Sequence, residues 1–318
     1  MKFINKFRGM MLARGLLLCS KVGFGQPGFL PRLAQLQGAP NMDYVKPADV
    51  AATMMNTGRS KLALSPLDLV IRGGLAGAIL AAATSLAFTA MVQTNQPLVG
   101  ALVFPVGLIL IVLLGLDLVT GSFGLLPLPW IENHVSTKTM LGNWSYVFLG
   151  NLIGSVVYGG LLAIALTNFG TAAPAGVAAK IIAIAEAKTT GYEALGFAGL
   201  VTVFVKAILC NWMVCLGIVA AMSTSSTIGK IACAYMPILI FFAQGFEHSV
   251  VNMFVIPTGM MMGAKITFSE WWLWNQIPVT LGNLVGGFVF TGLALYITHK
   301  PRSLAPAPLT EPAQVPAE

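Results

Sequence analysis

The sequence predicts an all-α, polytopic membrane protein of six transmembrane helices, arranged as two inverted three-helix repeats with broken second and fifth helices. Three observations predict it: a composition poor in charge, six long apolar runs, and an internal sequence match. Of the 318 residues, 56% are apolar and only 9% are charged. Soluble domains carry charge on about a quarter of their residues. So few charges indicate that lipid replaces water around much of the chain.

The apolar runs have the length of membrane spans. A helix needs roughly 20 apolar residues to cross the hydrocarbon core, and helix is favoured because hydrocarbon offers no partner to an open strand edge. The second and fifth runs are followed by apolar pieces at 122–130 and 255–262 that are too short to cross alone, so we expect them to be the second halves of interrupted helices. The six runs cover 70–92, 98–116, 144–166, 195–222, 231–254 and 277–297.

The third and sixth runs match each other. Gly282 and Asn283 each lie 132 positions after Gly150 and Asn151, within similar apolar surroundings. Three spans per half invert the second half relative to the first, and inverted repeats with paired broken helices are typical of a transport pathway near the membrane midplane. The glycines are expected to allow close helix packing, and the two asparagines to hydrogen-bond between helices rather than to face a pore.

Charge predicts the orientation and excludes a nucleic-acid partner. The net charge of +7 forms no basic stripe, because nine of the 18 basic residues precede Leu69. Basic flanks remain on the cytoplasmic side, so both termini are expected there, although Lys180, Lys188 and Lys265 then lie outside. Residues 1–41 form a basic extension, either a transit peptide or a misplaced start ahead of Met42. The six-helix domain covers 42–300, and the proline-rich tail 301–318 is expected to be disordered.

Four ionisable residues lie inside the apolar runs: Asp117, Lys206, Glu247 and His248. Such residues are costly in a membrane and are therefore functional candidates. His248 adjoins the second break and is interpreted as a functional group. Asp117 and Glu247 are expected to support the structure, by capping the backbone of their own breaks or by pairing with a neighbouring helix or subunit. Lys206 either pairs with one of these carboxylates or extends to the membrane interface.

The sequence lacks the residues that other functions would need. The four cysteines have no disulfide-framework spacing, and the three histidines lie far apart in the sequence, so no metal or cofactor is expected. A membrane enzyme would need a catalytic cluster, and of the histidines only His248 lies near the midplane. A neutral-solute channel of the aquaporin kind would carry paired Asn-Pro-Ala loops, and the sequence contains none.

Four motifs resemble the formate/nitrite transporter family over roughly 45–297. Two surround Asn143–Ser155 and Phe246–Phe254, and two more lie at Leu209–Leu216 and Ile277–Asn283. The resemblance implies an aquaporin-like protomer with its own pore, assembled as a homopentamer that conducts small monovalent anions such as nitrite and formate. Hydrosulfide and lactate are the alternative substrates in this family.

The resemblance also implies roles for individual residues. Thr120 and His248 would face each other across the pore, with Asn211 bonded near the histidine and Asn283 near the threonine loop. Lys188 would attract anions in the outer vestibule. The implied hydrophobic constrictions consist of Phe104, Leu108 and Val119 on one side, and Val214 and Phe241 on the other.

The sequence departs from the family pattern in one motif, and two of its segments are closer to nitrite-type members. The chain has Asp117-Leu118-Val119-Thr120 where the family commonly has Glu-Leu-Phe-Thr, so the acid is shorter and a phenyl ring is missing. The segment 185–190 is closer to nitrite-type members, and the start at Met42 resembles nitrite permeases of photosynthetic organisms. The membrane is then a plasma or inner membrane, or a plastid envelope if residues 1–41 are a transit peptide. We hypothesise that an anion is protonated near His248 and crosses as the neutral acid, since a bare anion pays heavily to enter a dry constriction.

Overall fold

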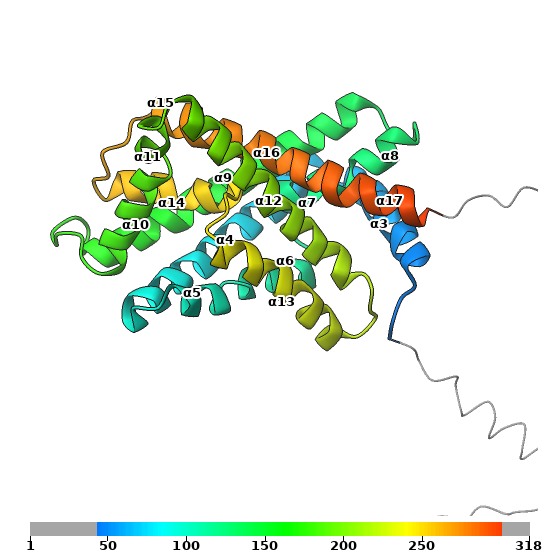
Figure 1. Ribbon diagram of the computed structural model, residues 1–318, viewed down its shortest axis with the longest axis horizontal. Helices are drawn as coiled ribbons and strands as arrows, with labels where there is room; N and C mark the ends of the chain where they lie inside the picture. The colour runs from blue at the N-terminus through cyan, green and yellow to red at the C-terminus, as the bar shows by residue number, and fades with distance from the viewer. Residues whose placement is uncertain (1–42, 301–318) are drawn as a thin grey trace, which may run out of the picture. The chain divides into compact units, whose positions relative to one another are not determined.

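A computed structural model describes residues 43–300, and within them nearly all regular structure is helical (Figure 1). The one strand-like feature there is a single bridge between Tyr44 and Thr224. The predicted extension 1–41 and tail 301–318 lie outside the described residues. A mostly helical chain with several apolar helices agrees with the prediction.

Four apolar helices in this part of the chain are long enough to cross a membrane. Three are continuous: α4 (Pro66–Thr94), α9 (Thr137–Thr167) and α12 (Phe197–Ala221). The fourth covers Phe268–His299 and is interrupted by two π-helical turns. Its parts are α15 (Phe268–Trp271), η1 (Trp272–Gln276), α16 (Ile277–Gly287), η2 (Phe288–Leu293) and α17 (Ala294–His299).

The remaining two apolar runs are divided into shorter helices. The first consists of α5 (Pro97–Val103) and α6 (Val106–Leu113), then α7 (Val119–Leu125) and α8 (Pro127–Ile131). The second consists of α13 (Thr227–Ala243) and α14 (Ser249–Met261). Interruption of both runs was predicted, but the positions were wrong. The second halves begin at Val119 and Ser249, not at 122 and 255, because apolar side chains continue through each break and conceal it from a hydropathy reading.

The two breaks have the same backbone. Gly115 and Gly245 adopt left-handed φ angles of 63° and 64°, which a residue with a side chain rarely tolerates. The amide of Leu116 then bonds the carbonyl of Ile111 at 2.9 Å, and the amide of Phe246 bonds that of Phe241 at 3.2 Å. This six-to-one hydrogen bond after a left-handed glycine is a Schellman ending. Both helices therefore end four residues before an acid, Asp117 or Glu247, and the left-handed glycine lies two residues before it.

Close helix pairs hold the long helices together. α4 packs along α9, and α12 packs along α16. A Cβ atom at Gly154 would collide with the carbonyl of Gly74, and one at Gly286 with that of Ile208. The predicted role of these glycines in helix packing is confirmed, since only hydrogen fits between the backbones. Helices α5 and α6 lie beside α13 at the lower edge of Figure 1.

Three further helices connect the long ones. α3 (Pro47–Leu62) precedes α4 and packs on α8 and α17 through Val50, Ala51 and Met54. α10 (Val177–Ala187) packs on α14, and the short α11 (Thr190–Glu193) leads into α12. These connections place Lys61 and Lys188 beside the two breaks.

Candidate functional site

The half-helices α7 and α14 begin where the two breaks meet, and one hydrogen bond joins them. The Nε2 atom of His248 lies 3.1 Å from the hydroxyl oxygen of Thr120. Both side chains are buried, although they are separated by 128 positions in the sequence. The structure therefore brings together the two residues that the sequence analysis placed opposite each other.

The protonation of His248 follows from its other ring nitrogen. Nδ1 accepts the backbone N–H of Val251 at 3.2 Å, so that His248 caps the N-terminus of α14. A nitrogen that accepts a hydrogen bond carries no proton, and a neutral imidazole then carries its proton on Nε2. Nε2–H thus donates to the Thr120 oxygen, which leaves the Thr120 hydroxyl hydrogen free for another acceptor.

The loop that carries Thr120 is fixed by polar groups of α12. The carbonyl oxygen of Thr120 accepts from Nδ2 of Asn211 at 3.0 Å and from the thiol of Cys215 at 3.3 Å. Asn211 Nδ2 also donates to the carbonyl of Asn283 at 2.6 Å. The thiol of Cys215 therefore contributes a hydrogen bond to the site.

The two repeat asparagines hold the two breaks in the same way. Asn151 Nδ2 donates to the carbonyls of Gly73 and Asp117, both at 2.9 Å, and its Oδ1 accepts from the amide of Val119 at 2.9 Å. Asn283 makes the equivalent three bonds, to the carbonyls of Ala207 and Glu247 at 2.8 and 2.9 Å and from the amide of Ser249 at 2.8 Å. Each asparagine connects the last residues of a break to the first amide of the next half-helix.

These contacts correct two expected positions. Asn283 was expected near the threonine loop and Asn211 near the histidine. Instead, the side chain of Asn283 binds the break that contains His248, and the side chain of Asn211 binds Thr120. The reason is the packing of α16 along α12, which directs the Asn283 amide toward the start of α14.

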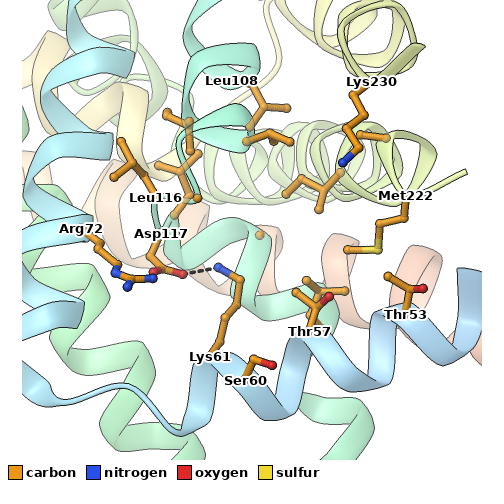
Figure 2. A pocket seen from close by; sticks show the side chains of 18 of the residues that line it. Thr53, Thr57, Ser60, Lys61, Arg72, Leu108, Leu116, Asp117, Met222 and Lys230 are labelled. Atoms are coloured by element: carbon orange, nitrogen blue, oxygen red, sulfur yellow. Dashed lines mark hydrogen bonds and ion pairs between the residues drawn. The ribbon is translucent and has the colours of Figure 1, made fainter. Parts of the chain in front are cut away.

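Each acid at a break pairs with a lysine from a connecting helix. Asp117 pairs with Lys61 of α3, as Figure 2 shows, and its second oxygen, Oδ2, has no hydrogen-bond partner among the described residues. Glu247 pairs with Lys188 at 2.7 Å. Lys188, expected to attract anions in the outer vestibule, is therefore neutralised by a carboxylate. The predicted pairing of both acids with a neighbouring helix agrees with this geometry.

The Glu247 carboxylate is surrounded by donors. Oε1 accepts from the Tyr192 hydroxyl at 2.8 Å, and Oε2 accepts from Asn252 at 2.8 Å in addition to Lys188. Asn275, in the π-helical turn η1, bonds Asn252 at 2.8 Å and the carbonyl of Lys188 at 2.9 Å. The carboxylate at the second break is thus fully hydrogen-bonded, unlike that of Asp117.

Lys206 does not pair with a carboxylate among residues 43–300. Its ammonium group lies 3.4 Å from the Tyr192 hydroxyl and 5.6 Å from the centroid of the Tyr192 ring. It therefore contacts Tyr192, which in turn donates to Glu247, and the first expected alternative, an ion pair with a carboxylate, is not seen among these residues.

The five residues of the expected constrictions are all buried in one apolar cluster. The rings of Phe104 and Phe241 meet edge to face at 5.6 Å, and Phe104 stacks on Phe242 at 3.9 Å. Phe241 also stacks on the His248 imidazole at 5.9 Å. Members of the two expected groups are therefore in direct contact, with Leu108, Val119 and Val214 in the same cluster.

A cavity of about 630 Å³ lies beside the first break, between α3, α4, α6, α12 and α13 (Figure 2). Asp117, Lys61, Arg72 and Lys230 supply its charged groups, and Leu108 lies in its apolar wall. Its lining includes Leu118 and Gly121, so the cavity reaches the start of α7, which carries Thr120.

Sequence reasoning missed several polar residues of the site. Lys61 lies before the first apolar run and Tyr192 just before the fourth, so neither is unusual by position. Asn252 lies within the motif around His248, and its polarity in an apolar run was an available signal. Asn275 reaches the cluster through the π-helical turn, which no sequence pattern predicted.

Comparisons with known proteins identify the family of the chain. The family model described as formate/nitrite transporter matches residues 48–297. A probable formate transporter of Methanothermobacter thermautotrophicus is 36% identical over 271 residues, covering 80% of this chain and 97% of the relative. The nitrite transporter NirC of Salmonella typhimurium is 32% identical over 254 residues, covering 78% and 90%.

Solved structures show the same similarity. A structure described as an FNT family ion channel aligns with a TM-score of 0.66 at 30% identity, covering 79% of this chain and 98% of that one. A pentameric formate channel with formate bound aligns with a TM-score of 0.59 at 26% identity, covering 74% and 97%. The match of the family model over most of the chain, together with these relatives, shows that the chain is an integral membrane protein that belongs to the formate/nitrite transporter family.

Proposed function

We propose that this protein carries small monovalent anions, nitrite or formate, across a membrane through a pore that passes between Thr120 and His248. The observation that carries the proposal is the hydrogen bond between these residues at the meeting point of two half-helices. Relatives named as formate and nitrite transporters support the substrate class. A preference for nitrite over formate rests only on the sequence, through residues 185–190 and the start at Met42. We assign it no enzymatic activity.

The proposed architecture is six spans in two inverted repeats around the pore. The equal offset of 130 residues between Gly115 and Gly245, and between Asp117 and Glu247, supports it. So do the matching hydrogen bonds of Asn151 and Asn283. The protomer is aquaporin-like in this arrangement, and each protomer has its own pore.

In the proposed mechanism, the anion binds to the free hydroxyl hydrogen of Thr120. Two half-helix N-termini point toward this position, and their partial positive charge favours an anion without fixing it as a full charge would. The fully charged anion is costly beyond this point because Phe104, Phe241 and their neighbours form a dry constriction. Protonation of the weak acid near His248 removes that cost, and the neutral acid crosses.

His248 acts in this mechanism chiefly as a hydrogen-bond donor. To carry a second proton, the imidazole would have to give up the Val251 amide, since Nδ1 is already an acceptor. We therefore propose that the proton enters from the aqueous vestibule, while Nε2–H of His248 orients Thr120. The proposal therefore includes a proton that moves with the anion and a solvent path through which this proton arrives.

The assembly and orientation are also proposals. A homopentamer is supported by the pentameric formate channel of similar fold. Both termini are assigned to the cytoplasmic side by their basic residues. The cavity with Lys61 then faces the cytoplasm and Lys188 the opposite side. The membrane is a plasma or inner membrane, or a plastid envelope.

The test is anion uptake into proteoliposomes at several external pH values, with nitrite and formate compared. Thr120→Val keeps the shape of the side chain and removes its hydroxyl, whereas Thr120→Ser keeps the hydroxyl. We expect uptake that rises toward acid pH, a loss of at least about tenfold in Thr120→Val, and near-parental uptake in Thr120→Ser. His248→Ala should lower uptake similarly, because Thr120 then loses its donor.

The outcomes separate the alternatives. Equal uptake by parent and Thr120→Val would place the pathway elsewhere. Undiminished nitrite uptake with no accompanying proton movement would overturn the neutral-acid mechanism. No flux of either anion, with flux of hydrosulfide or lactate instead, would assign the pore to those alternative substrates.

A further inference from the structure

The cavity beside the first break is much larger than the proposed transported anions require. Nitrite and formate each have three non-hydrogen atoms, whereas a volume of about 630 Å³ falls in the range of about 300–1,000 Å³ typical of small-molecule sites. One wall is apolar and includes Leu108, Ile111 and Met222. The opposite wall is the face of α3 that carries Thr53, Thr57 and Ser60. The cavity therefore offers hydroxyl groups along one side.

Its charges are unbalanced. Lys61, Arg72 and Lys230 line it, and Asp117 is its only acidic residue, which leaves a surplus of two positive charges. Lys61 is neutralised by Asp117. Arg72 and Lys230 make neither an ion pair nor a side-chain hydrogen bond with any residue between 43 and 300. In Figure 2 the two basic groups approach the cavity from different helices, α4 and α13.

One acceptor in the cavity also lacks a partner. Asp117 is only 1% exposed, and its Oδ2 accepts no hydrogen bond from the described residues while Oδ1 binds Lys61. Buried polar atoms are nearly always hydrogen-bonded, and an ionised carboxylate can only accept. A ligand that complements this site would bring two negative charges, and an O–H or N–H group on it could donate to Oδ2.

We propose that this cavity binds a hydrogenphosphate group, as inorganic phosphate or as a soluble phosphate monoester. Arg72 and Lys230 would bind its anionic oxygens, the guanidinium in a bidentate manner. Its P–OH group would donate to Asp117 Oδ2. Sulfate has the same charge and shape but no O–H, so it leaves Oδ2 unpaired and faces carboxylate repulsion. The phosphodiester group of a common phospholipid has no P–OH either, and it carries one negative charge rather than two.

Occupation of the cavity would inhibit transport, and this consequence rests on the proposed function. A single proton neutralises nitrite or formate but leaves hydrogenphosphate charged, so it cannot cross the constriction as a neutral species. The bound dianion covers the approach to Thr120 from the α3 side. Phosphate on that side therefore lowers monovalent anion flux without itself being carried.

The first test measures binding of inorganic phosphate to the purified protein in detergent at about pH 8, where the dianion predominates, by calorimetry. We expect saturable binding of one phosphate per protomer. Arg72→Gln and Lys230→Gln should each weaken it at least about tenfold, whereas Lys138→Gln, at an exposed lysine outside the cavity, should not. Absence of saturable binding, or equal effects of all three variants, would overturn the proposal.

The second test concerns Asp117. Sulfate should bind the parent protein at least about tenfold more weakly than phosphate, and Asp117→Asn should narrow this ratio because an amide can donate. Sulfate binding as tight as phosphate in the parent protein would remove Asp117 from the site, and this comparison needs no variant to fold. Phosphatidic acid added to the micelle distinguishes the sources: competition with phosphate would assign the site to a lipid monoester rather than to the soluble ligand proposed.

These measurements do not depend on transport. Binding with no flux would uphold the site and overturn the proposed function. Anion flux without phosphate binding would uphold the proposed function and overturn the phosphate site. In proteoliposomes, phosphate on the α3 side should lower uptake in the parent and in Lys138→Gln but not in Lys230→Gln.

Discussion

Asn151 and Asn283 show how single side chains fix both breaks. Each side chain satisfies one carbonyl and one amide of backbone that has left the helix, and also bonds a carbonyl inside a neighbouring helix. In a bilayer, unpaired backbone groups are costly, and irregular backbone is tolerated only where protein partners satisfy it. The same residue at the same position in both halves therefore meets the same physical requirement twice.

Replacement of either asparagine by alanine should destabilise the protein. Asn283→Ala leaves the buried amide of Ser249 and the carbonyl of Glu247 without partners, at a cost of about 1–3 kcal/mol for each group left unpaired. Asn151→Ala removes the equivalent three bonds and should cost a similar amount. Thermal unfolding in detergent measures both. A large loss in one variant and none in the other would contradict the equivalence of the two breaks.

The side-chain partners were the least predictable part of the site. The sequence indicated that His248, Thr120 and the two acids are important, because polar residues in apolar runs are costly. It did not indicate that Lys61 pairs with Asp117, since that depends on how α3 folds back toward the break. Nor could it show which break the side chain of Asn211 or of Asn283 contacts. The direction of each side chain follows from the packing of α12 against α16.

At the scale of elements, the close approach of helices depends on particular glycines. Gly154 of α9 faces the backbone of α4, where an added Cβ would collide with Gly74. Gly142 of the same helix has nothing within 4 Å of an added Cβ. The two positions share an element but differ in the space around them.

This difference predicts opposite effects of alanine. Gly154→Ala should force α4 and α9 apart and destabilise the protein by about 1–3 kcal/mol, as overpacking does. Gly142→Ala should be neutral or stabilising by up to about 1 kcal/mol, because alanine favours helix over glycine. Melting temperatures of the two purified variants, measured in one detergent, test this. A comparable loss in both would show that helix approach does not limit stability at Gly154.

The breaks themselves were predictable in number but not in position. Two interruptions were predicted because two long apolar runs are each followed by a piece too short to cross a membrane alone. Their exact residues depend on Gly115 and Gly245, whose positive φ angles end α6 and α13. Among the 34 glycines of the chain, hydropathy does not distinguish these two. The π-helical turns of the last helix were equally hidden, because they leave the apolar pattern unchanged.

At the scale of the whole chain, one ion pair joins segments far apart in sequence. Glu132, at the end of α8, pairs with Lys300, which follows α17, and the Tyr296 hydroxyl lies 3.3 Å from the same carboxylate. The hydrogen bond from Lys300 lowers the pKa of Glu132 below its ordinary value, with the charge of Lys300 acting in the same direction. Both groups lie outside the membrane-spanning helices, where salt screens their attraction.

The stability that this pair contributes should depend on pH. A carboxyl group whose pKa is lowered by folding stabilises the protein above the pKa of the unfolded chain, about 4.3 for glutamate, and the contribution is lost as the pH falls through the folded value. Glu132→Gln should therefore lower the melting temperature slightly at neutral pH, and less as the pH falls below about 4. High salt should reduce the neutral-pH difference, because the pair is exposed. A difference that persists unchanged at acid pH or in high salt would show that Glu132 stabilises the protein through packing or uncharged hydrogen bonds rather than through its charge.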